Sequence, residues 1–263
     1  MLAWGMDYGE YLRLPELLAC QQPRSSEHDE LLFVIIHQTT ELWMKLCIHE
    51  LRAVARHVHA DDLPPAFKML SRVGRVQSHM TESWETLATM TPADYLRFRH
   101  TLGTASGLQS HQYRTIEFLL GAKDPGMLAM HRGEPAYAEL AATSAAPSLY
   151  DETLQLLARR GFAVPAAVTD RDWNQPYVAS PAVEAAWLTV YRDVDRYWDL
   201  YELAEKLVDV EYRFQKWRYA HLKTVERVIG FRRGTGGTAG AAYLATRLER
   251  GFFPELFSLR TQM

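Results

Sequence analysis

Two of the ten histidines lie where an imidazole could take part in chemistry. His37 follows Phe33 by four residues and His221 follows Trp217 by the same interval, so each imidazole shares a helix face with an aromatic ring. A flat apolar face with a single imidazole suits an axial ligand to a haem iron. A lone histidine on an apolar face is more often a packed core residue. The spacing alone leaves both interpretations open.

An arginine and a tyrosine form a second candidate group. Tyr95 and Arg99 are four residues apart, which places them one turn apart on the same helix face. A phenol beside a guanidinium can hold a carboxylate through charge-assisted hydrogen bonds. A solvated surface pair has the same spacing. The pair is therefore a candidate anion clamp, with a surface pair as the alternative.

The glycine-rich segment at residues 234–239, GTGGTA, fits the dinucleotide pattern G-x-G-x-x-A. That pattern binds a dinucleotide only after a strand and before a helix. Here a helical pattern precedes it, so we exclude a dinucleotide site. Two interpretations remain. The segment is a flexible turn, or it is a loop whose backbone N–H groups and Thr235 and Thr238 hydroxyls close over an anionic or polar ligand.

Three common metal sites are excluded by spacing. A di-iron bundle needs Glu-x-x-His pairs, and no histidine in this chain follows an acidic residue by three positions. The pair His49-Glu50 lacks the second histidine of an HExxH zinc site. Cys20 and Cys47 are too few for a cysteine-based zinc site or a disulfide framework, and we expect two reduced thiols.

The elements that must position these residues are helices. Helical periodicity and capping residues predict helices over residues 8–22, 26–59, 64–90, 91–103, 110–121 and 148–161. Residues 162–180 are irregular, and no Gly or Pro lies between Pro181 and Ile229. One helix of that length would measure about 70 Å, so we expect a break there or a helix that serves an oligomer. The fold prediction is all-α and bundle-like, with long C-terminal helices and no significant β-sheet.

The length, charge and composition of the chain limit the kinds of partner that we expect it to bind. A chain of 263 residues can form a single domain over residues 1–263. The formal net charge of −3 gives no reason to expect nucleic acid. The N-terminus has no basic stretch followed by an apolar one, and the longest apolar run, residues 31–36, is too short to span a bilayer. We expect a cytoplasmic protein without a membrane partner.

Several segments together resemble the tryptophan 2,3-dioxygenase family. They keep the family's order and approximate spacing over nearly the whole chain, and residues 122–180 match least. The segments are YGEYL (8–12), HDELLFVIIHQTTELW (28–43), YLRFR (95–99), SGLQS (106–110), QYRTIEFLLG (112–121), LVDVEYRFQKWRYAHLKTVERVIGFRRGTGG (207–237) and FFPELF (252–257).

The resemblance implies a fold, a cofactor and a reaction. Members of that family are all-helical homotetramers with one b-type haem per subunit, ferrous in the active form. They insert both atoms of O₂ across the indole C2–C3 bond of L-tryptophan and give N-formyl-L-kynurenine. That reaction is the first step of tryptophan degradation by the kynurenine pathway. The same cofactor, substrates and assembly are expected here.

The resemblance also implies roles for single residues. His221 would be the axial ligand of the haem iron, and His37 would be the catalytic histidine, hydrogen-bonded to the indole N–H. An indole N–H is a very weak acid, so we expect a positioning hydrogen bond rather than proton abstraction. Arg99 and Tyr95 would hold the substrate carboxylate, and Thr235 its carboxylate and ammonium groups. The other substrate-binding residues would be Phe33, Val34, Ile35, Ile36 and Ser106, with Tyr8, Tyr11 and Leu12 from the N-terminal segment (1–22) of a neighbouring subunit.

Two segments depart from the family pattern. The loop that commonly reads GTGGSSG is GTGGTAG here, so Ala239 stands where a hydroxyl is usual. Leu108 stands where the motif SSGFQS has an aromatic residue. These differences keep two alternatives open. One is a haem protein of the same fold that binds or senses indoles or does other indole chemistry, and the other is a helical scaffold without a cofactor.

Overall fold

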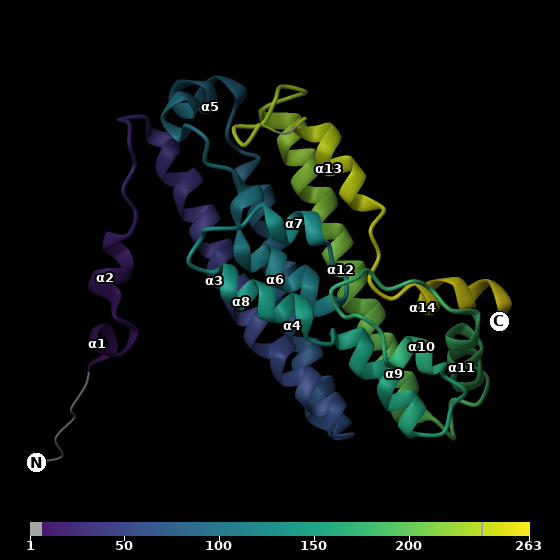
Figure 1. The fold of residues 1–263 in the computed structure, drawn as a ribbon. Helices are drawn as coiled ribbons and strands as arrows, with labels where there is room; N and C mark the ends of the chain where they lie inside the picture. Colours follow the sequence, from purple (N-terminus) through teal and green to yellow (C-terminus); the bar gives the residue numbers. More distant parts are fainter. Residues whose placement is uncertain (1–6, 238) are drawn as a thin grey trace, which may run out of the picture.

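The computed structural model describes residues 7–237 and 239–263, and within them the regular secondary structure is entirely helical (Figure 1). The predicted all-α fold without a β-sheet is confirmed for this part of the chain. In chain order the helices are α1 (Tyr8–Leu12), α2 (Leu14–Ala19), α3 (His28–His59), α4 (Leu63–Leu87), α5 (Pro92–Phe98), η1 (Arg99–Leu102), η2 (Gly107–Gln109), α6 (His111–Leu120), α7 (Pro125–Ala129), α8 (Tyr137–Ala145), α9 (Leu149–Arg159), α10 (Ala166–Thr169), α11 (Pro181–Arg192), α12 (Trp198–Val228), α13 (Ala241–Leu248), α14 (Pro254–Ser258) and η3 (Leu259–Gln262).

Three long helices form the body of the fold. α4 packs against both α3 and α12, while α6 and α9 lie against α3 (Figure 1). Their facing positions are fully buried apolar side chains, for example Val54 of α3, Leu70 of α4 and Leu207 of α12. Burying such side chains is the main favourable term in folding. The long helices therefore give a rigid frame on which site residues can be placed.

The long stretch without glycine or proline contains a break, as predicted. α11 ends at Arg192, Asp193 leaves the helical region with φ −136° and ψ 63°, and α12 begins at Trp198. The break lets α11 pack against α14 and η3 at the C-terminal end of the chain. α12 packs along α4 and carries His221 near its C-terminal end.

The N-terminal segment differs from the single helix predicted over residues 8–22. α1 and α2 are two short helices separated by Arg13, whose φ of 52° is left-handed. Pro15 explains the break, because its ring clashes with the carbonyl four residues earlier and it has no N–H to donate. The two helices form an arm that extends away from the bundle (Figure 1). Residues 1–6 of the predicted segment lie outside the described residues.

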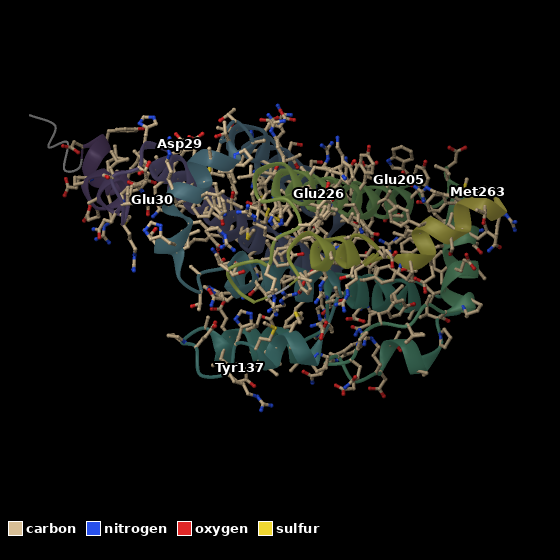
Figure 2. The ribbon with its side chains drawn as sticks, turned by 90° about the horizontal axis from the view of Figure 1, so that it is seen from above. Asp29, Glu30, Tyr137, Glu205, Glu226 and Met263 are labelled. Atoms are coloured by element: carbon tan, nitrogen blue, oxygen red, sulfur yellow. The ribbon has the colours of Figure 1, made fainter. Side chains whose placement is uncertain are left out.

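The start of α3 is also different from the prediction. The predicted start of this helix at residue 26 is wrong, because α3 begins at His28 and its N-cap, Glu27, makes no side-chain cap. Glu30 instead bends back and accepts the backbone N–H groups of Arg24 at 2.8 Å and Ser25 at 2.7 Å. Figure 2 shows Asp29 and Glu30 beside the arm, at the opposite end of the molecule from Met263.

Five short α-helices, α7, α8, α10, α13 and α14, were not predicted from sequence, and α10 lies within the segment 162–180 that was predicted to be irregular. α7 has Asp124 as its N-cap, accepting the N–H groups of Gly126 and Met127. α8 has no side-chain cap. Short helices of this kind depend on tertiary packing, which a single-sequence pattern does not contain.

One described helix, α3, has the length and mean hydropathy that a membrane span would need. Only 22% of its most apolar window is buried in this chain, and Leu31, Ile35 and Leu42 are exposed. A single helix of this kind is weak support for a span, because a long helix of a bundle passes the same criterion. α3 therefore presents an open apolar face in this chain.

Replacing Ser148 by alanine is expected to destabilise the protein by about 1–2 kcal/mol, because the residue is a buried helix cap. Its hydroxyl donates to Asp151 at 2.6 Å and accepts the Asp151 N–H at 3.2 Å, which fixes the start of α9 as the sequence predicted. Thermal unfolding should show a fall of roughly 2–8 °C. Ser71→Ala, on the exposed side of α4, is the matched control and should leave the melting temperature nearly unchanged.

Candidate active site

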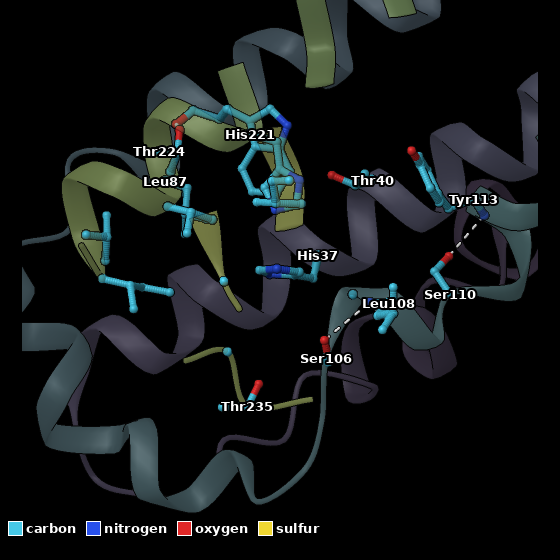
Figure 3. A pocket seen from close by; sticks show the side chains of 18 of the residues that line it. His37, Thr40, Leu87, Ser106, Leu108, Ser110, Tyr113, His221, Thr224 and Thr235 are labelled. Atoms are coloured by element: carbon cyan, nitrogen blue, oxygen red, sulfur yellow. Dashed lines mark hydrogen bonds between the residues drawn. The ribbon is translucent and has the colours of Figure 1, made fainter. Parts of the chain in front are cut away.

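A cavity opens where α3, α4, α6, α12 and α13 meet the segment 99–110 and the glycine loop (Figure 3). It brings together residues that lie up to about two hundred positions apart in sequence. Among the residues singled out from sequence, those that line it are Phe33, His37, Tyr95, Arg99, Ser106, His221 and Thr235.

The two histidines lie on different long helices and both face the cavity, His37 from α3 and His221 from α12 (Figure 3). Burial lowers the pKa of His221 to about 4, and the nearby His37 adds to the shift because two positive charges would repel. Burial also lowers the pKa of His37. Both imidazoles are therefore neutral at neutral pH, which is the form that can coordinate a metal or accept a hydrogen bond.

The tautomer of His37 follows from its hydrogen bond. Its Nδ1 lies 2.7 Å from the carbonyl oxygen of Phe33, one turn earlier on α3. A carbonyl oxygen only accepts, so Nδ1 must carry the proton and Nε2 of the neutral ring is left with a free lone pair. The Phe33 ring lies against the imidazole, with 4.1 Å between ring centroids. His37 therefore offers the cavity an acceptor beside an aromatic surface.

His221 sits among aromatic rings. Its imidazole is parallel to the Trp84 indole, at 4.4 Å and 7°, and lies 5.9 Å from the Trp217 ring. Leu87, Met90, Val225 and Val228 extend this apolar wall. The indole N–H groups of Trp84 and Trp217 are buried and have no partner among the described atoms.

These residues fit a haem better than a bare metal ion. The described residues contain no group of three His, Cys, Asp or Glu side chains that could hold an ion. A metal at His221 must therefore bring its other ligands with it, as a macrocycle does. Apolar walls, a neutral imidazole and unpartnered buried N–H groups meet the requirements of a large flat cofactor with polar edges.

The predicted anion clamp lies at the cavity wall. Arg99 donates through Nη2 to the carbonyl of Arg233 at 2.8 Å, while its Nε is buried without a partner. Tyr95 is only 4% exposed. Burial raises the pKa of the Tyr95 phenol, and the Arg99 guanidinium opposes that rise, so the two groups are close. A free guanidinium N–H beside a protonated phenol can receive a carboxylate.

The glycine loop lies over the segment that carries Ser106. Thr235 donates its hydroxyl hydrogen bond to the carbonyl of Ala105. A Cβ on Gly236 would lie 2.6 Å from the Ser106 Cβ, so only glycine allows this approach. Ala239 is exposed, and Thr238 lies outside the described residues. The loop is thus held against the cavity mouth by contacts that depend on its composition.

Six residues predicted for substrate binding do not line the cavity of this chain. Val34 and Ile36 lie on other faces of α3, and Ile35 is 41% exposed. The other three belong to the arm outside the bundle (Figure 1). They are exposed by 75%, 74% and 40% for Tyr8, Tyr11 and Leu12.

Comparison with known proteins decides the family. The family model described as tryptophan 2,3-dioxygenase matches residues 2–141 and 141–263, nearly the whole chain. The chain belongs to the tryptophan 2,3-dioxygenase family. The tryptophan 2,3-dioxygenases of Erythrobacter litoralis and Caulobacter vibrioides are similar to it at 56% and 55% identity, over 99% and 100% of both sequences. That of a Polaromonas species is 56% identical over 98% of this chain and 88% of its own length.

The comparisons confirm the family resemblance that the sequence showed. They also confirm the enzyme class, which is an oxidoreductase of the dioxygenase type. Within this member of the tryptophan 2,3-dioxygenase family, sequence reasoning missed several cavity residues. Arg218 was detectable, because it precedes His221 by three positions on the same helix face. Trp84, Tyr113, Arg114 and Arg247 had no local signal, since only tertiary packing brings them to the cavity.

Proposed function

We propose that this chain cleaves the indole C2–C3 bond of L-tryptophan with O₂ and releases N-formyl-L-kynurenine. The reaction balances without another reductant, because one oxygen atom is added to C2 as a formyl group and the other to C3 as a ketone. The observation that carries the proposal is that the Arg99 guanidinium and the Tyr95 phenol line the same largely apolar cavity as the imidazoles of His37 and His221. The tryptophan 2,3-dioxygenases to which the chain is similar support the same substrate.

The proposed cofactor is one haem b per chain, ferrous in the active form, and His221 would hold its iron. When bound, it would supply the iron that activates O₂. The apolar side chains around His221 would limit water in this part of the cavity. A neutral imidazole is the form required for ligation, and burial maintains it.

The chain's own residues would orient tryptophan. Arg99 and Tyr95 receive the carboxylate, and Thr235 contacts the carboxylate and ammonium groups when the loop closes. Phe33 packs on the indole, and the unprotonated Nε2 of His37 accepts the indole N–H. Fixing both ends of the substrate presents C2–C3 in one orientation, and orientation of this kind supplies a large share of a rate enhancement. Ser106 supports the loop at the cavity mouth.

Replacing His37 by alanine is expected to lower kcat/KM for L-tryptophan by about tenfold without abolishing turnover, because one neutral hydrogen bond is lost. The cleaner measurement compares L-tryptophan with 1-methyl-L-tryptophan, which lacks the N–H. The native enzyme should prefer L-tryptophan, and His37→Ala should lose most of that preference. His49→Ala, an exposed position of α3, is the control. Complete loss of turnover in His37→Ala would instead indicate proton abstraction by this residue.

The proposed assembly is a cytoplasmic homotetramer in which the arm of one subunit completes a neighbour's site. The arm extends from the bundle with Tyr8 and Tyr11 exposed, and α3 leaves an open apolar face. Tyr8, Tyr11 and Leu12, with Val34, Ile35 and Ile36 of α3, would then contribute to substrate binding across or near the subunit boundary. Sedimentation at micromolar concentration should give the tetramer mass.

One experiment tests the function. The purified protein, loaded with haem and reduced, is mixed with L-tryptophan and air while absorbance and oxygen uptake are followed. The expected result is a Soret band and equal consumption of tryptophan and O₂ with appearance of N-formylkynurenine. Tryptophan binding without oxygen uptake would favour a sensing or binding protein. A protein that takes up no haem would favour a scaffold.

A further inference from the structure

Arg247 of α13 lines the cavity and its guanidinium is only partly satisfied. The side chain is 11% exposed, and both Nε and Nη1 are buried without a hydrogen-bond partner among the described atoms. Only Nη2 is engaged, donating to the Tyr243 hydroxyl at 2.7 Å and approaching the Met127 sulfur at 3.4 Å. A buried cation that keeps two free donors is costly unless a ligand satisfies it.

The nearest carboxylate does not satisfy this arginine. Nη1 of Arg247 lies 3.8 Å from Oδ2 of Asp124, which is too far for a hydrogen bond. That oxygen already accepts from Arg250 at 2.8 Å. The other oxygen of Asp124 caps α7 by accepting the N–H groups of Gly126 and Met127. One acidic group thus faces two arginines and is committed to Arg250 and the α7 backbone.

A second buried group near Arg247 is also positive. Arg114 and Arg218 share the single carboxylate of Glu117, and all three side chains are at most 3% exposed. Arg218 also donates to the backbone carbonyl of Arg247 at 3.2 Å, which joins this group to α13. The Nε of Arg114, another cavity residue, has no partner. Glu211, near Arg218, has a pKa raised by burial and accepts the backbone N–H groups of Phe252 and Phe253.

This positive side of the cavity is separate from the substrate clamp. Arg99 contacts Tyr95 and the carbonyl of Arg233 in the glycine loop. Arg247 contacts Tyr243 and Met127 and shares none of those contacts. The cavity therefore has two anion-binding groups on different elements, and an amino-acid substrate has only one carboxylate.

We propose that Arg247, oriented by Tyr243, binds a propionate carboxylate of the haem, and that this contact retains the cofactor. The proposal rests on the proposed function, which requires a haem in this cavity. Each free N–H group of this guanidinium, on Nε or on Nη1, can donate a charge-assisted hydrogen bond to a carboxylate. Tyr243 keeps the guanidinium plane fixed through its hydroxyl and through its ring, 4.8 Å from the guanidinium carbon.

The test measures haem loss from the full-length protein to an excess of apomyoglobin, without any turnover. Arg247→Met is expected to lose haem about ten- to a hundredfold faster than the native protein, because a charge-assisted contact is removed. Arg75→Met, the same change at an exposed position of α4, is the control and should stay within about twofold. Equal rates for Arg247→Met and the native protein would overturn the proposal.

A modified cofactor identifies which carboxylate is bound. The native protein loaded with iron protoporphyrin dimethyl ester should lose it faster than haem by a factor similar to that of the substitution. Arg247→Met should show little further loss with the ester, because its contact is already absent. If haem retention is normal but the preference for L-tryptophan over tryptamine falls, Arg247 binds the substrate instead and the proposal is wrong.

Two further readouts separate this role from others. The melting temperature of haem-free Arg247→Met should not fall, since the substitution removes two unsatisfied buried donors. A fall in the melting temperature of the haem-free protein equal to that in the haem-loaded one would assign Arg247 a purely structural role and overturn the proposal.

A native protein that takes up no haem or ester at all would overturn the proposed function together with this inference. Normal haem uptake with unchanged loss rates would overturn the inference alone.

Discussion

Replacing His221 by alanine is expected to remove dioxygenase turnover and most of the bound haem. The residue stacks on the Trp84 ring and lies beside Trp217, and burial keeps its imidazole neutral, which is the form that ligates a metal. The described residues include no metal-binding cluster that could replace it. The measurement is the haem-to-protein ratio and the Soret spectrum of the purified variant, followed by oxygen uptake with L-tryptophan.

A rescue experiment makes this prediction specific to ligation. His221→Gly leaves space for free imidazole, so adding imidazole should restore part of the Soret band and of the oxygen uptake. His49→Ala, on the exposed side of α3, controls for loss of a histidine and should retain normal haem content. A His221→Ala protein that keeps a full complement of haem and normal turnover would rule out His221 as the axial ligand.

The helices that carry the site could be predicted from local sequence because their ends are chemically marked. Thr91 and Asp94 form a capping box at the start of α5, where the sequence predicted a helix to begin, and Ser110 and Gly121 bound α6. Spacing of four residues correctly placed Phe33 beside His37, since both lie on one helix. Residues on one helix keep their relation whatever packs against them, so such pairs can be read from sequence.

Contacts between helices could not be predicted in the same way. Trp84 lies against His221 although 137 positions separate them, and no local pattern of either helix records that contact. Arg247 lies on α13, a short helix that depends on packing against α12. The excess of positive charge around Arg247 also depends on a tertiary contact, because the nearby carboxylate of Asp124 accepts its hydrogen bond from Arg250.

Some side chains of the site are held in place by the helices, whereas others can change their contacts when a ligand binds. The two imidazoles are carried by the long helices α3 and α12, whereas Arg99, the proposed carboxylate ligand, is held partly by the Arg233 carbonyl of the glycine loop. A substrate carboxylate offers Arg99 a stronger, charged acceptor than that carbonyl. Binding of substrate should therefore change the contact between the clamp and the loop while the imidazoles stay in place.

Arg99→Ala is accordingly expected to lower kcat/KM for L-tryptophan by about 100- to 1000-fold, or roughly 3–4 kcal/mol, because a charged contact to the substrate carboxylate is lost. Haem content should be unchanged, since Arg99 is proposed to bind the substrate rather than the haem. The nearby Arg97, whose side chain is 64% exposed, provides the control, and Arg97→Ala should stay within about twofold.

Tryptamine, which has the indole and the amine but no carboxylate, shows whether the loss arises at the clamp. The native enzyme should strongly prefer L-tryptophan to tryptamine, and Arg99→Ala should turn over the two at similar kcat/KM, because neither can use the missing guanidinium. If Arg99→Ala lowered both substrates equally, its effect would come from a disturbed loop rather than from carboxylate binding. If the preference for L-tryptophan were unchanged, the carboxylate would be held by another group, and the unpartnered Nε of Arg99 would need a different ligand.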